Sequence, residues 1–338
     1  TALIVGGGIA GMQAALSLAT RGVPVHLVEK DAQLGGYLGN NVEATVDGLA
    51  PIAMARDMQL KLYQNKNVTV HLNCEVETTV GTIGSFESKL VFADKDEKTW
   101  LHLGAVIMAT GGHEGATTEY GLGTADSVMT QAQLKKGLAS GDIDVSGTEN
   151  VVMIQCVGSR QKEGRHYCSR ICCMWAIANA LKIKEKNPQA RVFILYRDVM
   201  TYGFYEQYYS KARSAGIIFM NYSLDNKPQV EMVEGKPVVK FMDTVLNEDI
   251  ELTADLLVLS TGVDPEDSNS KLAAAFNVSL NDDGFFAEAD SKWRPIEFQK
   301  VGLYLAGTAH SPMPLNSVIM QAEAAAQNAP FLAGHRTP

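Results

Sequence analysis

The sequence predicts an α/β protein built from two units, each around a parallel sheet. The chain of 338 residues has the length of about two domains. It opens with a strand, a glycine turn, a helix and a second strand, and another alternation of strands and helices begins near residue 151. Apolar residues make up 46% of the chain and charged residues 20%, which is typical of globular domains with buried cores.

Composition also excludes some classes of function. No apolar run reaches the roughly 18 to 20 residues that span a bilayer, so we expect no membrane insertion. The net charge of −9 argues against nucleic acid as a partner, because phosphate binding needs a positive surface. The first residues show neither a basic segment nor a cleavage site, which predicts a cytoplasmic protein.

Apolar runs and helix-prone segments predict the elements in order. In the first half we expect strands at 2–5, 23–28 and 105–109, helices at 12–20, 52–63 and 127–138, and antiparallel strands between 68 and 92. In the second half we expect strands at 151–154, 191–196, 217–220, 229–232, 237–242, 255–260 and 301–306, and helices at 169–186, 205–215 and 317–327.

The first turn has the pattern Gly6-x-Gly8-x-x-Gly11, between a strand and a helix. Gly6 permits a tight turn, Gly8 lets the backbone approach a pyrophosphate, and Gly11 lets helix and strand pack closely. The pyrophosphate would bind at the helix N-terminus, and Glu29, which ends the second strand, would accept hydrogen bonds from a ribose. This pattern predicts a Rossmann-type, dinucleotide-binding-like domain.

Four of the five cysteines lie in one stretch, at Cys156, Cys168, Cys172 and Cys173. Such a cluster in a reduced cytosolic chain indicates metal or redox chemistry. Four thiolates suit a [4Fe–4S] cluster, and the alternatives are a redox disulfide or a zinc site. Cys74 lies alone in an expected strand and is interpreted as a buried apolar residue.

The turn after the strand 151–154 lacks a second dinucleotide-binding fingerprint, since Gly158 is the one glycine of that pattern present there. Arg160, Arg165 and Arg170 lie within the cysteine stretch and could offset the charge of a cluster, or form a solvated basic loop. Arg197 could still meet a nucleotide phosphate.

Further glycines extend the pattern. The doublet Gly35-Gly36 and the turns Ala109-Thr110-Gly111, Ser260-Thr261-Gly262 and Ala306-Gly307-Thr308 resemble the thioredoxin reductase-like flavoproteins along nearly the whole chain. The resemblance implies FAD in a discontinuous domain of residues 1–120 and 263–338. A second α/β domain, 145–262, would carry the cysteines, and 121–144 would connect the two.

The resemblance also implies which residues bind FAD. The family's final Gly-Asp is replaced here by Gly307-Thr308, which weakens one contact to the ribityl chain. The implied residues are Gly6, Gly8, Ile9, Ala10, Gly11, Glu29, Lys30, Gly35, Gly36, Val76, Ala109, Thr110, Gly111, Gly307, Thr308, Ser317 and Val318. No catalytic residue is assigned.

The motifs Gln155-Cys156-Val157-Gly158-Ser159-Arg160, Tyr167-Cys168-Ser169-Arg170-Ile171-Cys172-Cys173 and Tyr196-Arg197-Asp198 resemble the heterodisulfide reductase A family. Because ferredoxin-like C-x2-C-x2-C runs are lacking, the similarity is to the short form found in bacterial sulfur oxidation. It implies FAD, a [4Fe–4S] cluster held by the four cysteines, B- and C-type partner subunits, a homodimer, and NAD(H) as donor or acceptor of electrons. The alternative is an NAD(P)H-dependent disulfide oxidoreductase that uses a cysteine pair.

Overall fold

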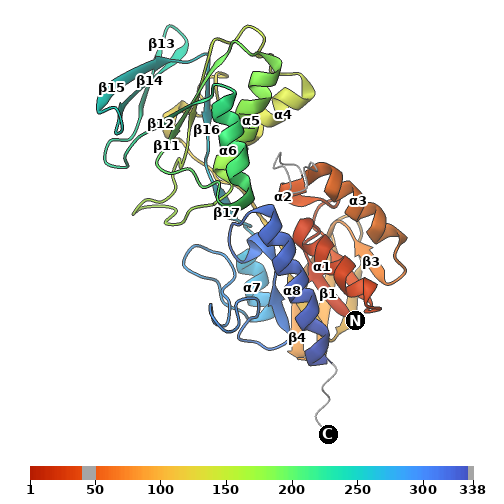
Figure 1. Cartoon of the computed structure of the whole chain (residues 1–338). Helices are drawn as coiled ribbons and strands as arrows, with labels where there is room; N and C mark the ends of the chain where they lie inside the picture. Colours follow the sequence, from red (N-terminus) through yellow and green to blue (C-terminus); the bar gives the residue numbers. More distant parts are fainter. Residues whose placement is uncertain (40–50, 334–338) are drawn as a thin grey trace. The chain divides into compact units, whose positions relative to one another are not determined.

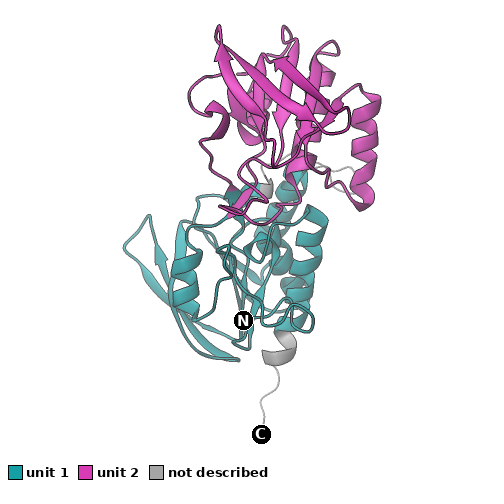
Figure 2. Ribbon diagram, turned by 90° about the vertical axis from the view of Figure 1, so that its left-hand side faces the viewer, with its two compact units in different colours: residues 1–40, 47–113, 265–338 teal, residues 41–46, 114–264 magenta. Residues whose placement is uncertain are grey.

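The computed structural model describes residues 1–39 and 51–333. These residues form two compact units, shown in different colours in Figure 2. Unit 1 comprises the described residues up to His113 and those from Pro265 onward, and unit 2 comprises 114–264. The chain passes between the units within β8 (Gly112–Glu114) and β17 (Val263–Pro265), which pair as a two-stranded sheet.

Unit 1 is built on a parallel sheet in the order β18-β7-β1-β2-β3. Its remaining elements are helices and an antiparallel sheet, β4-β5-β6. Their bounds are β1 (Ala2–Val5), α1 (Ile9–Thr20), β2 (Val25–Val28), α2 (Gly36–Gly39), α3 (Pro51–Gln64), β3 (Val68–His71), β4 (Cys74–Thr82), β5 (Ser85–Phe92), β6 (Lys98–Leu103), β7 (Ala105–Met108), α7 (Asn269–Phe276), β18 (Leu303–Leu305) and α8 (Leu315–Ala333).

Alternating side chains of the parallel strands divide the core of unit 1 into two layers. Ile4 and Leu27 point to the face covered by α1, α3 and α8, where Leu18 and Ala322 are fully buried. Leu3 and the other alternate residues point to the opposite face, covered by β4–β6 and α7. The result is a layer of helices, a parallel sheet and an antiparallel layer (Figure 1).

Unit 2 repeats this plan. Its parallel sheet has the order β12-β11-β10-β16-β9, with α4, α5 and α6 on one face and the antiparallel sheet β13-β14-β15 on the other (Figure 1). The bounds are β9 (Val128–Thr130), α4 (Gln131–Ser140), β10 (Asn150–Ile154), α5 (Cys172–Lys186), β11 (Arg191–Tyr196), α6 (Glu206–Ser214), β12 (Ile218–Asn221), β13 (Gln229–Val233), β14 (Lys236–Asp243), β15 (Glu248–Thr253) and β16 (Leu256–Leu259).

The structure differs from the sequence prediction at the segment 121–144. Predicted to be a connector, it supplies β9 at the edge of the second sheet and α4 on its helical face. Residues 114–120, predicted in the first domain, also belong to unit 2. The turn from β9 into α4 is stable because Thr130 and Gln133 form a reciprocal capping box.

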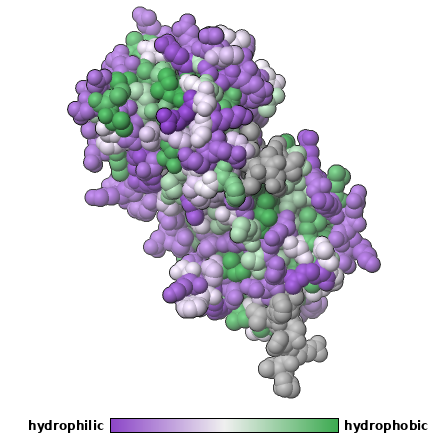
Figure 3. Space-filling model, viewed as in Figure 1, coloured by the Kyte–Doolittle hydropathy of each residue, from purple (hydrophilic) through white to green (hydrophobic). Residues whose placement is uncertain are grey.

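The surface is mixed in character. On the face drawn in Figure 3, hydrophobic residues form separate groups among hydrophilic ones. Within the described residues, no helix is both long enough and apolar enough to cross a membrane.

Candidate functional site

The glycine turn between β1 and α1 is compact in the way the sequence predicts. Gly6 has φ +109°, and a Cβ there would lie 2.3 Å from the carbonyl oxygen of Ala109. A Cβ on Gly11 would lie 1.8 Å from the carbonyl oxygen of Gly6. A Cβ on Gly8, by contrast, would meet nothing closer than the Cα of Gly36 at 3.8 Å. Two glycines are therefore required by the fold, whereas Gly8 leaves space above the turn.

The N-terminus of α1 opens onto that space. Its N-cap residue, Gly8, offers no side chain to the free N–H groups, and the first turn has no acidic residue. An uncapped helix N-terminus carries partial positive charge and suits a phosphate.

Glu29, at the end of β2, is buried beneath the turn. Its carboxylate accepts hydrogen bonds from the Gly7 amide at 2.6 Å and the Asp31 amide at 2.9 Å. Burial raises the pKa of Glu29, and these two hydrogen bonds oppose the shift. The carboxylate is thereby fixed in orientation, with acceptor positions still available for ribose hydroxyls.

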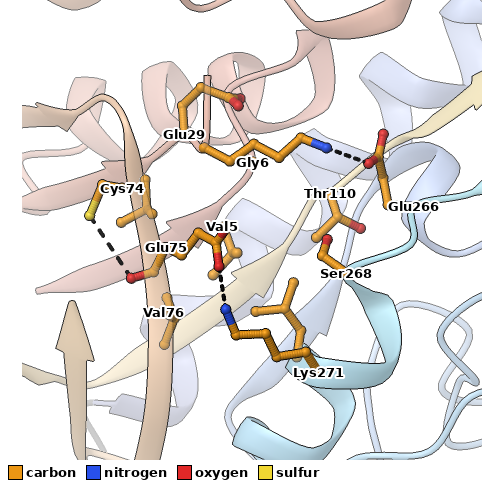
Figure 4. A pocket seen from close by; sticks show the side chains of 13 residues that line it. Val5, Gly6, Glu29, Cys74, Glu75, Val76, Thr110, Glu266, Ser268 and Lys271 are labelled. Carbon is orange, nitrogen blue, oxygen red and sulfur yellow. Dashed lines mark hydrogen bonds and ion pairs between the residues drawn. The ribbon is translucent and has the colours of Figure 1, made fainter. Parts of the chain in front are cut away.

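Two cavities of unit 1 meet around Glu29, Lys30, Thr110 and Glu266, which line both. One continues toward Cys74 and Val76 on β4 (Figure 4), and the other passes the glycine turn. Lys30 and Glu266 form an ion pair of 2.6 Å at the junction. Together the cavities make an extended trough along the carboxyl ends of β1, β2 and β7, where open α/β sheets bind their ligands.

Most of the residues predicted to bind a dinucleotide line this trough. They are Gly6, Gly8, Ile9, Ala10, Glu29, Lys30, Gly36, Val76, Ala109, Thr110, Gly111, Thr308 and Val318. Four others do not line it: Gly11, Gly35, Gly307 and Ser317. Gly35 donates its N–H to the carbonyl of Gly7, and Gly307 donates its N–H to Gln321 Oε1. Both hydrogen bonds hold backbone that adjoins residues of the trough.

Sequence reasoning missed the wall formed by the segment that follows β17 and by the start of α7. Glu266, Ser268 and Lys271 line the first cavity, and Lys271 forms an ion pair with Glu75 of β4 (Figure 4). These residues lie far along the chain from the glycine turn and carry no motif. Only the tertiary fold brings them to the site.

The four predicted cysteine ligands line one small cavity in unit 2. Cys156 follows β10, Cys168 lies in the loop, and Cys172 and Cys173 begin α5. The loop 155–171 that joins β10 to α5 fills the position where a dinucleotide-binding unit has its glycine turn. Ser159, Arg160, Ser169, Arg170, Asp198 and Met200 complete the lining.

The cysteine loop stores backbone strain. Cys156, Arg160 and Arg170 adopt left-handed conformations with φ of +59°, +55° and +60°. Each such residue costs on the order of 1 kcal/mol and persists only where surrounding contacts impose it. Strain of this kind concentrates at functional sites.

Burial dominates the electrostatics of the thiols. It raises the pKa of Cys156, raises that of Cys172 well above its usual value and raises that of Cys173 to about 12. The neighbouring thiols raise the pKa values further, and Arg197 and Arg160 lower that of Cys156. All five cysteines of the chain carry free thiols.

Arg165 does not line the cysteine cavity, although the sequence suggested that it offsets cluster charge. Its guanidinium pairs with Asp264 at 2.7 Å and donates to the carbonyl oxygens of Ala116, at 2.8 Å, and Thr261. Tyr167 adds a hydrogen bond of 2.8 Å to the carbonyl of Val263. These contacts fasten the cysteine loop to both segments that lead toward unit 1.

The guanidinium of Arg197 also forms hydrogen bonds within the protein. Its terminal nitrogens donate to the carbonyl oxygens of Ser159 and Arg160. They are thus not directed toward a nucleotide phosphate. Among the described residues, no three or more His, Cys, Asp or Glu side chains converge closely enough to hold a metal ion as they stand.

Comparison with known proteins supports the plan of both units. Residues 2–93 match the family of FAD dependent oxidoreductases. The thioredoxin reductase of T. acidophilum superimposes with a TM-score of 0.64 at 20% identity, covering 97% of this chain and 96% of that one. The chain has the thioredoxin reductase fold. The predicted fold class is therefore confirmed.

Proteins of the heterodisulfide reductase A type are similar in sequence. The A-type iron-sulfur protein of CoB–CoM heterodisulfide reductase from Methanocaldococcus jannaschii is 30% identical, over 96% of this chain and 63% of its own length. Its A-type counterpart in a ferredoxin/F(420)H(2)-dependent CoB–CoM heterodisulfide reductase from Methanosarcina acetivorans is 29% identical, over 98% of this chain and 53% of its own length. The resemblance to the heterodisulfide reductase A family is confirmed, and the chain spans somewhat more than half the length of these relatives.

Proposed function

We propose that this chain is an electron-transferring flavoprotein component of a heterodisulfide reductase-like complex. It would hold FAD in the trough of unit 1 and a [4Fe–4S] cluster on Cys156, Cys168, Cys172 and Cys173. The observation that carries the proposal is that all four cysteines line one cavity at the carboxyl end of β10. In a two-dinucleotide flavoprotein that position belongs to the second nucleotide.

The trough suits FAD in shape and chemistry. The start of α1 would receive the pyrophosphate, Glu29 the adenosine ribose, and the cavity beside Val76 the adenine. Thr308 and Val318 line the other end, where the flavin ring and ribityl chain would lie.

The cysteine cavity suits an iron–sulfur cluster by its donor set. Four thiols with no disulfide among them, beside two arginines that line the same cavity, match the needs of an anionic cluster. Bound FAD would exchange electrons in pairs or singly, and the cluster would accept them singly. The loop 155–171 must shift its side chains for the four sulfurs to converge, since they do not form a metal-ligating group as they stand.

The relatives are named as A subunits of heterodisulfide reductases, which supports the proposal that this chain acts within a complex of several subunits. We propose B- and C-type subunits as partners, a homodimer of this chain, and sulfur-compound oxidation in the cytoplasm as its context. NAD(H) would have to reach the flavin directly, because Arg197 is engaged and the turn after β10 lacks a fingerprint.

The test is anaerobic purification with flavin, iron and acid-labile sulfide measured on one sample. We expect about four iron and four sulfide per FAD. Flavin without iron, from cells and handling that preserve clusters, would contradict the cluster. Turnover of NAD(P)H with a small disulfide by that iron-free protein would establish a dithiol flavoprotein instead.

A further inference from the structure

Arg160 and Asp198 form an ion pair at the cysteine cavity, and the two residues differ in exposure. Arg160 Nη2 lies 2.7 Å from Asp198 Oδ2, and both residues line the cavity. The Arg160 side chain is 24% exposed, whereas that of Asp198 is 62% exposed. Solvent therefore screens the anion more than the cation, and the cavity retains a net positive field.

Arg160 lies beside the whole set of thiols. It lines the same cavity as Cys156, Cys168, Cys172 and Cys173. Cys173 also donates a hydrogen bond from Sγ to the main-chain oxygen of Asp198 at 3.7 Å. This hydrogen bond belongs to the free thiol and is made to the main chain, so the ion pair would act on a cluster through its charges.

The position of Arg160 is imposed by the fold. Its φ of +55° is unfavourable for a residue with a side chain. Its carbonyl oxygen accepts a hydrogen bond of 3.1 Å from Arg197, which holds the strained residue in place. If Arg160 simply belonged to a solvated basic loop, neither its left-handed backbone conformation nor its hydrogen bond from Arg197 would be needed.

We infer that the Arg160–Asp198 pair sets the reduction potential of the cluster that the four cysteines hold. The inference rests on the proposed function. If one electron from bound flavin entered the cluster, no bond would form or break, and the net charge with four thiolates would change from roughly −2 to roughly −3. A nearby cation stabilises the more negative state, so Arg160 raises the potential and Asp198 moderates it.

The test is a potentiometric titration of the purified, cluster-loaded protein, followed by electron paramagnetic resonance. Arg160→Gln should lower the potential and Asp198→Asn should raise it. Arg160→Gln should change the one-electron equilibrium constant about tenfold, which corresponds to about 59 mV. Asp198→Asn should cause a smaller shift of opposite sign, because solvent screens its more exposed carboxylate. Arg160→Lys keeps the charge and should leave the potential near that of the wild type.

Shifts in opposite directions distinguish an electrostatic role from a structural one. Shifts in the same direction, or none, would overturn the inference, and so would a shifted potential in Arg160→Lys. If the Arg160→Gln variant does not take up the cluster, the Asp198→Asn variant can decide the question alone. An unchanged reduction potential in Asp198→Asn would refute the inference. Lys182→Gln, from the exposed Lys182–Glu185 pair on α5, is the matched control and should cause no shift.

The two proposals fail in different ways. Wild-type protein that lacks iron would refute the cluster and this inference together. Wild-type protein that contains iron and gives a signal, but whose potential ignores both substitutions, would refute the inference alone.

Discussion

The glycine turn of unit 1 allows the effect of a methyl group on the fold to be separated from its effect on the cofactor. At Gly11 a Cβ would lie 1.8 Å from a carbonyl oxygen, and at Gly8 it would meet no atom closer than 3.8 Å. Gly8 has φ −73° and ψ −174°, a conformation that alanine adopts freely. We predict that Gly8→Ala leaves the apoprotein folded and weakens FAD binding, whereas Gly11→Ala destabilises the apoprotein itself.

The magnitudes follow from these contacts. Alanine is a poorer N-cap than glycine, so Gly8→Ala should lower the free energy of unfolding by no more than about 1 kcal/mol. Gly11→Ala forces the backbone apart and should lower it by about 3 kcal/mol. Since the methyl group at residue 8 would occupy the space for the pyrophosphate, we expect at least a tenfold loss of FAD affinity, which is about 1.4 kcal/mol.

The assays are urea unfolding of the apoprotein and titration with FAD followed by flavin fluorescence. Gly22→Ala is the control, because Gly22 has φ +80° and a Cβ there meets nothing within 4 Å. That variant should lose about 1 kcal/mol of stability through backbone strain and keep its FAD affinity. Gly8→Ala protein that binds FAD as the wild type does would refute the idea that a phosphate approaches this turn.

Three further predictions concern the rest of the molecule. Cys172→Ser should lose iron and retain FAD, while Cys74→Ser should keep its iron; a metal and flavin analysis in which Cys172→Ser retains full iron would contradict the ligand assignment. Burial lowers the pKa of His71 from 6.5 to about 4, so the unfolded chain takes up the proton first and stability falls as the pH drops from about 6.5 to about 4. Because the ring is partly exposed, we expect the free energy of unfolding, measured with urea, to fall by about 1 to 2 kcal/mol over this pH range. The fall should be smaller in His71→Phe, and an equal fall in that variant would contradict the assignment to His71. Arg165→Gln should lower the free energy of unfolding of the protein by about 2 to 3 kcal/mol, since it leaves a partly buried carboxylate and main-chain carbonyls without their partner; an unchanged urea midpoint would refute this role.

The glycine turn could be predicted from the sequence because its spacing between a strand and a helix is a local pattern. The same is true of the strand and helix order, which hydrophobic periodicity specifies. The contact that requires Gly6 could not be predicted in this way, because it is made with Ala109, which is remote in the sequence. The wall formed by Glu266, Ser268 and Lys271 could not be predicted, because it depends on the C-terminal part of unit 1 returning to the glycine turn. β9 was missed for a different reason: three residues at a sheet edge give too short a pattern.

Arg165 shows how composition can mislead about a role. Its place among the cysteines suggested a charge near the cluster, and its partners instead are a carboxylate and main-chain oxygens remote in sequence. Arg160, in the same stretch, does line the cavity. The sequence supplies the number of cations in such a loop, whereas the backbone conformation determines which of them faces the thiols.

The two proposed ligand sites use one arrangement of backbone. In each, a helix without a side-chain N-cap and without acidic residues in its first turn begins at the carboxyl end of a central strand. The short turn before α1 leaves that positive end open to a phosphate, whereas a longer loop of residues 155–171 precedes α5, and Cys172 and Cys173 are the first helical residues. The field that favours a pyrophosphate also favours thiolates and an anionic cluster. On the proposed function, a change of ligand from nucleotide to iron–sulfur cluster would need a new loop with its strained residues and the contacts of Arg165, while the parallel sheet keeps the same plan in both units.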